Sequence, residues 1–145
     1  MQFPKVRHCL VCENVRPEAG GLSTIVGFYG VAPDVRIKLP SIENPVPYLA
    51  FLLIGGEVEG DFEMKIRISD DADSVIFEAP SSKFVAPDKR GELRVGVNIT
   101  GLKFPRAGLY KIILFVNGKL NFDEIFEVVV RPPTASADGS RLSKF

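Results

Sequence analysis

The chain has 145 residues, of which 46% are apolar and 25% are charged, so it has the length and composition of one globular domain. Lysine plus arginine and aspartate plus glutamate each number 18, and this balance gives no net field that would attract nucleic acid or an anionic membrane. The first eight residues lack the apolar segment of a secretory signal, and the longest apolar run, 48–54, is too short to cross a bilayer, so we expect a cytoplasmic protein.

Apolar and polar residues alternate along much of the chain, as in "DFEMKIRIS" (61–69), and this period of two is typical of half-buried antiparallel strands. Together with frequent turn residues, the alternation predicts about eight strands, at 5–15, 22–30, 47–55, 61–69, 74–79, 92–100, 108–116 and 121–131. The segment 31–46 contains three prolines and is the least regular. We expect a domain over residues 1–132 and a flexible polar tail over 133–145.

A Cys-x-x-Cys pair, Cys9 and Cys12, follows His8, the only histidine. Residues three apart on a strand point to opposite faces, so the two thiols cannot bind one ion or form a disulfide. No other cysteine or histidine could complete a zinc site. We therefore interpret both cysteines as structural residues of the first strand.

The turn "SDDADS" gathers Asp70, Asp71 and Asp73 between two predicted strands. Clustered carboxylates can bind calcium, which makes these residues weak candidates for a metal site. Aspartate is also common in turns for its local hydrogen bonding, which is the simpler interpretation. No catalytic residue and no cofactor are predicted anywhere in the chain.

Two features near the C-terminus predict a particular sheet topology. Asn117 and Gly118 separate two apolar runs and tolerate the positive φ of a type I′ hairpin turn. Tyr110 follows a glycine at the start of a strand, as does the tyrosine corner of immunoglobulin-like domains, whose hydroxyl bonds to nearby backbone. The sequence thus predicts an all-β, single-domain, antiparallel immunoglobulin-like sandwich of about seven to eight strands.

The stretches "CLVCENVRPEAGGLSTIVGFYG" and "LKFPRAGLYKIILFVNGK" resemble an uncharacterised family of small bacterial proteins, a domain of unknown function. The resemblance covers about residues 5–131. It implies a one-domain bacterial β-sandwich and supplies no activity, ligand or catalytic residue.

Two predicted strands, "YLAFLLI" and "LYKIILFV", are apolar on both faces, whereas a sandwich strand normally has one wet face. In an immunoglobulin-like topology they lie in one sheet, and one apolar row would need a cover, either segment 31–46 or a second copy in a homodimer. The residues predicted for this interaction face are Leu49, Phe51, Leu53, Ile113 and Phe115.

The function that these patterns favour is a non-catalytic protein-interaction or structural module with an unidentified protein partner. The alternative is a calcium- or zinc-dependent binding protein or hydrolase that uses the acidic loops.

Overall fold

The computed structural model describes residues 2–131, and within them the side chains of residues 87–90 are not described. The strands are β1 (Lys5–Pro17), β2 (Ser23–Val31), β3 (Arg36–Leu39), β4 (Val46–Asp70), β5 (Val75–Glu78), β6 (Ser82–Leu102), β7 (Gly108–Val116) and β8 (Lys119–Val130), with one short 3-10 helix, η1 (Ala19–Gly21). The all-β prediction is confirmed. The tail predicted over 133–145 lies outside the described residues.

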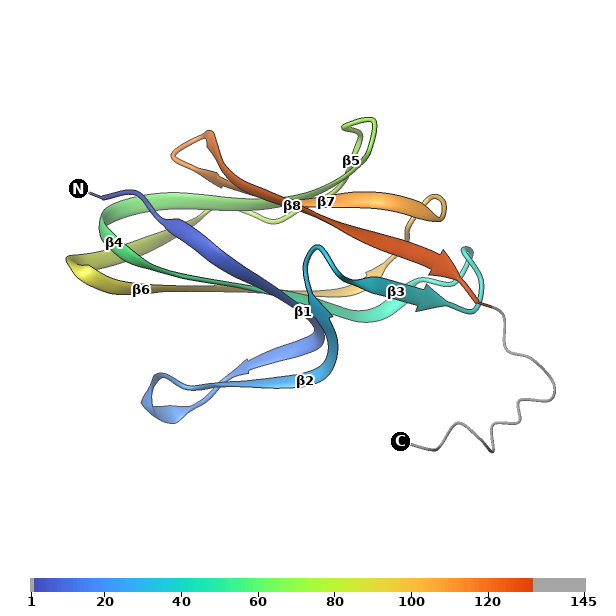
Figure 1. Ribbon diagram of the computed structural model, residues 1–145, viewed down its shortest axis with the longest axis horizontal. Helices are drawn as coiled ribbons and strands as arrows, with labels where there is room; N and C mark the ends of the chain where they lie inside the picture. Colours follow the sequence, from blue (N-terminus) through green and yellow to red (C-terminus); the bar gives the residue numbers. More distant parts are fainter. Residues whose placement is uncertain (1, 132–145) are drawn as a thin grey trace.

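All eight strands belong to one sheet, in the order β2-β1-β4-β7-β8-β3, with β5 and β6 also paired to β4. The sheet forms two layers because β4 and β6 bend together, which Figure 1 shows at the left of the molecule. The first half of β4 pairs with β1 and the second half with β7. Long strands that pass from one layer to the next are a known way of turning the corner of a two-layer β fold.

The bend of β4 lies at "GGEVEG" (55–60), which sequence patterning reads as a turn between two strands. Glu57 and Gly60 have φ of 56° and 126°, and the pairing with β6 shifts register on both sides of Val58. Glycine-rich backbone permits such bulges without ending the strand. The two predicted strands 47–55 and 61–69 are therefore one element.

The main core fills the space between the layers. Phe51 on the first half of β4 meets Phe126 on β8, with ring centroids 5.4 Å apart. Tyr110 stacks on the same Phe126 ring at 6.0 Å. Aliphatic side chains from both layers surround these rings, among them Leu49, Leu53, Ile68, Ile112, Leu114 and Val128.

Segment 31–46, expected to be irregular, contains strand β3, which pairs in parallel with β8. Its inward residues Val35, Ile37 and Leu39 are buried in the main core. Proline at both ends of this four-residue strand hid it from pattern reading, because proline usually marks a loop. Segment 31–46 thus completes the core and does not cover an outer face.

Neither the sandwich nor the immunoglobulin-like arrangement is confirmed, since the hydrogen bonds join all strands into one bent, nearly closed, barrel-like sheet where those folds have two separate sheets. Within the described residues, no helix is both long enough and apolar enough to traverse a bilayer.

Candidate functional site

The structure separates the five residues predicted for the interaction face. Leu49, Phe51 and Leu53 point into the main core and are completely buried, so they are not available to a partner. Ile113 and Phe115 lie on the outer face of β7, in the other layer. Ile113 is nevertheless buried, and the Arg67 guanidinium lies 4.6 Å from the centroid of the Phe115 ring. The prediction of one shared face was wrong because the bend in β4 moves its first half away from β7.

The opposite, outward row of β4 is covered by a hairpin that we call the arm, residues 13–27 of β1 and β2. Ala50 and Leu52 of this row are buried with Cys12 and Val15 in a second, smaller core beneath the arm. In Figure 1 the arm is the blue hairpin that extends below β6. The apolar second face of β4, which suggested a missing partner, is therefore satisfied within the chain.

The Asn98 side chain fastens the arm to β6. The Asn98 amide accepts a hydrogen bond from the Val15 N–H at 2.9 Å and donates one to the Val15 carbonyl at 3.0 Å. Beyond Cys12, β1 no longer pairs with β4, so Asn98 replaces the missing strand at this position. The arm is thus docked through its β1 strand, and β2 forms its outer side.

Strand β2 is a free edge of the sheet, since it pairs only with β1, and β3 lies at the other end of the strand order. Most of its side chains are exposed on both faces of the hairpin. Five apolar residues on β2 or directly before it are exposed, namely Leu22, Ile25, Val26, Phe28 and Val31.

No Asp, Glu, Lys or Arg occurs from Ala19 to Pro33. Sheet edges in monomeric proteins normally carry charges, prolines or strong bulges that block pairing with another chain. From 22 to 26 this edge has none of these, so the chemistry it offers is main-chain pairing with apolar flanking contacts.

Sequence reasoning missed this edge, although its signal was present. The uncharged run of 15 residues could have marked β2, but glycines in the run were interpreted only as turn residues. Whether a strand lies at an edge depends on long-range pairing, and single-strand patterning does not report that.

The two cysteines lie on opposite sides of β1, as their spacing predicts. Cys9 is in the main core and Cys12 in the smaller core under the arm, and both are free thiols. Burial raises the pKa of both thiols, that of Cys9 to about 12. Neither thiol is therefore an ionised nucleophile near neutral pH. His8 is exposed on the same strand.

The acidic loop is bound by the protein's own cations. Asp70 is buried and accepts hydrogen bonds from the Ala72 and Ser74 N–H groups, at 2.9 and 2.8 Å, which close the turn. The bond from Ser74 is the main reason that the pKa of Asp70 is lowered. Arg106 pairs with both Asp70 and Asp71, and Lys111 with Asp73. The carboxylates suggested for calcium thus stabilise a turn, and no group of potential ligands among the described residues could hold a metal ion.

A shallow cleft of about 530 Å³ lies beside β3 and β8. Tyr29, Leu109 and Ile125 line it together with the basic residues Arg36, Lys38 and Arg131. Arg36 is already paired with Glu127 at 3.2 Å. With its lining charges of both signs and its open shape, the cleft defines no ligand class, and β2 is the stronger candidate site.

The fold and the free edge define an all-β protein built from one bent sheet with an exposed, apolar edge strand. The chain belongs to the family described as a family of unknown function (DUF6941), whose match spans residues 7–128. No curated protein matches the sequence.

Among solved structures, the chain is similar to the Pseudomonas fluorescens alkylpurine DNA glycosylase AlkC, solved bound to DNA containing an abasic site analog. The likeness has a TM-score of 0.44 and 10% sequence identity, and covers 83% of this chain and 30% of the glycosylase. The chain spans less than a third of that protein, and a likeness this distant carries no argument about fold or function.

Proposed function

We propose that this protein is a non-catalytic, cytoplasmic interaction module that accepts an extended segment of a partner protein along the free edge of β2. The observation that carries the proposal is the uncharged edge itself, with unpaired backbone groups and exposed apolar side chains on both faces. Strand addition of this kind derives affinity from main-chain hydrogen bonds and specificity from the flanking side chains. The free thiols of Cys9 and Cys12 are in keeping with a reducing compartment.

A photo-crosslinking residue placed on the edge tests the proposal. Phe28 is 59% exposed on β2, so we expect the fold to tolerate its replacement by the similarly shaped benzoylphenylalanine. The matched control is Leu120, which is 60% exposed on β8, away from the edge. We expect irradiation of cells that produce the protein to yield a discrete protein adduct from position 28 and none from position 120. Equal labelling at both positions, or no adduct at position 28, would contradict the proposal.

A further inference from the structure

The unpaired backbone groups of β2 can be identified from its pairing with β1. The Glu18 N–H donates to the Leu22 carbonyl at 2.8 Å, which makes these two residues a hydrogen-bonded pair. Such pairs alternate with non-bonded pairs along an antiparallel ladder. Ser23 is accordingly opposite Pro17, which has no N–H to donate. Ser23 and Ile25 therefore direct their N–H and C=O groups away from β1, toward the free edge.

The regular part of this edge is short and has a centre. It begins after η1 and ends at Gly27, whose φ of 65° interrupts the extended backbone. Residues 22–26 lie between these limits with Thr24 in the middle, and the two outward-directed residues are placed symmetrically on either side of it. An antiparallel strand that is as long as residues 22–26, and that directs its N–H and C=O groups outward at the corresponding positions, matches this edge.

We propose that the strand which β2 accepts is the β2 of a second copy of this chain, paired antiparallel about a two-fold axis at Thr24. This inference rests on the proposed function. In this register the backbone of Ser23 forms hydrogen bonds with Ile25 of the second copy. By symmetry, the backbone of Ile25 forms them with Ser23 of the second copy. Leu22 is opposite Val26 of the second copy, and the two Thr24 residues face each other. The pairing uses both free edges, so it closes as a dimer with an isologous interface.

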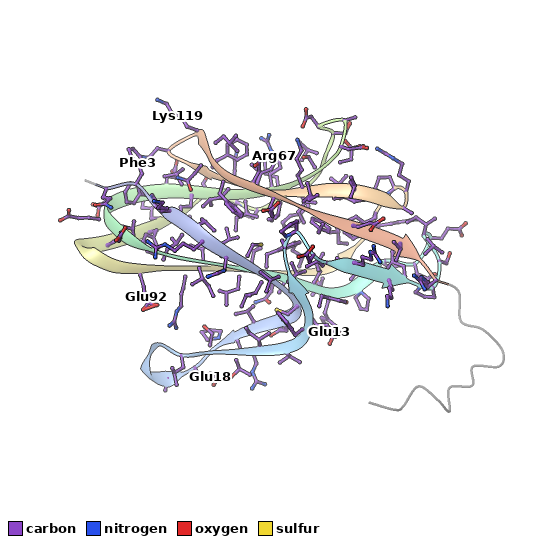
Figure 2. The ribbon with its side chains drawn as sticks, in the orientation of Figure 1. Phe3, Glu13, Glu18, Arg67, Glu92 and Lys119 are labelled. Carbon is purple, nitrogen blue, oxygen red and sulfur yellow. The ribbon has the colours of Figure 1, made fainter. Side chains whose placement is uncertain are left out.

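Charge is the reason that a second copy fits. When a strand pairs with itself about a central residue, a charged side chain near the centre faces its own copy or a near neighbour, and like charges repel. No charged residue lies on β2. The nearest charges, Arg16 and Glu18, pair with each other at 3.4 Å, so they bring no net charge to the axis. Glu18 also accepts a hydrogen bond from the Thr24 hydroxyl at 2.7 Å, so its charge lies beside the paired segment and is balanced there by Arg16. Figure 2 shows the Glu18 side chain on the arm.

The mass of the purified protein in solution tests the proposal. We expect analytical ultracentrifugation to find a concentration-dependent dimer, and Ile25→Lys to raise the dissociation constant at least about tenfold, since a charge would then face the second copy. Ile125→Lys is the matched control, because Ile125 is 42% exposed on β8 and Ile25 is 37% exposed on β2. A wild-type protein that stays monomeric up to submillimolar concentration, or equal weakening by the two variants, would overturn the proposal.

A cysteine at the axis tests the register separately. Two Thr24 residues facing each other as a non-bonded pair have Cα atoms about 4.5 Å apart, within disulfide range. Thr24→Cys should oxidise to a covalent dimer and Thr100→Cys, exposed on β6, should not, while the native thiols stay protected by burial. Covalent dimer from both variants, or from neither, would overturn this register. If position 28 forms an adduct in cells with a different polypeptide and the purified protein is monomeric, the second copy is wrong while the proposed function stands.

Discussion

Polar side chains that bond to backbone groups hold turns of this protein in place. The Tyr110 hydroxyl donates to the Arg106 carbonyl at 2.5 Å, and the Arg106 N–H donates back to the hydroxyl at 3.3 Å. Asn117 holds the β7–β8 turn in place, because its side chain accepts a hydrogen bond from the Glu63 N–H at 2.9 Å. These bonds satisfy backbone groups that the ladders leave unpaired.

The hydroxyl of Tyr110 gives a residue-scale prediction. The Tyr110 ring is buried against Phe104 and Phe126, and Tyr110→Phe keeps this packing while it removes the bonds to Arg106. A buried hydrogen bond of this kind contributes about 1 kcal/mol, so the free energy of unfolding should fall by about that amount in urea denaturation. Tyr48→Phe is the control, because Tyr48 is exposed and its substitution should change little. Equal stability of the two variants would show that Tyr110 contributes only its ring.

Such residues differ in how far the sequence could predict them. The Tyr110 hydroxyl bonds to backbone only a few residues away, and Asn117-Gly118 sets a local backbone shape. Local sequence patterns therefore predict both features. Asn98 reaches a backbone 83 residues away, and Asp70 is neutralised by an arginine 36 residues away. Those partners follow from the fold and not from spacing, which is why Asp70 was considered as a calcium ligand.

At the scale of elements, few buried residues hold the arm against the rest of the protein. The smaller core beneath it contains only Cys12, Val15, Ala50 and Leu52 as buried residues. A region with few buried apolar contacts opens locally at a lower free energy than the main core does. The two bonds from Asn98 to Val15 therefore account for a large share of the docking of the arm.

Asn98→Ala should release the arm without unfolding the domain. Two hydrogen bonds of about 1 kcal/mol each correspond to a roughly thirtyfold increase in the open population. Because Cys12 lies under the arm and Cys9 in the main core, a thiol reagent applied to the native protein should label Cys12 that much faster and leave Cys9 unchanged. Thr100→Ala, two residues further along β6, is the control. Parallel acceleration at both thiols would mean global unfolding and would refute a separately opening arm.

At the scale of the whole molecule, local patterns located most strands and missed how they connect. Alternation and turn residues give the strands of the hairpins β1–β2 and β7–β8 to within two residues, since both are local pairings. The same patterns divide β4 at 55–60, because a glycine-rich segment can be a turn or a bend and only its pairing with β6 decides between them. Reading β4 as two strands led to the prediction that its first half shares an interaction face with β7, whereas the structure buries Leu49, Phe51 and Leu53 in the main core.

At the start of the bend, one glycine permits the close approach of β1 to β4. At Gly55 a Cβ atom would lie 2.0 Å from the Lys5 carbonyl oxygen, which belongs to rigid backbone. Gly55→Ala must therefore push β1 away from β4, and β1 carries Cys9 and Val11 into the main core. The neighbouring Gly56 has open space where its Cβ would be, and its φ lies outside the left-handed region.

These two adjacent glycines allow a matched test of the bend. Gly55→Ala should lower the free energy of unfolding by about 3 kcal/mol, the upper range for forcing atoms into a packed site. Gly56→Ala should change it by less than about 0.5 kcal/mol or raise it slightly, since alanine restricts the unfolded chain. Urea denaturation of both variants, with similar m-values, measures the difference. If the two substitutions cost the same, the contact of Gly55 with Lys5 does not determine the bend, and the layers are held together by core packing alone.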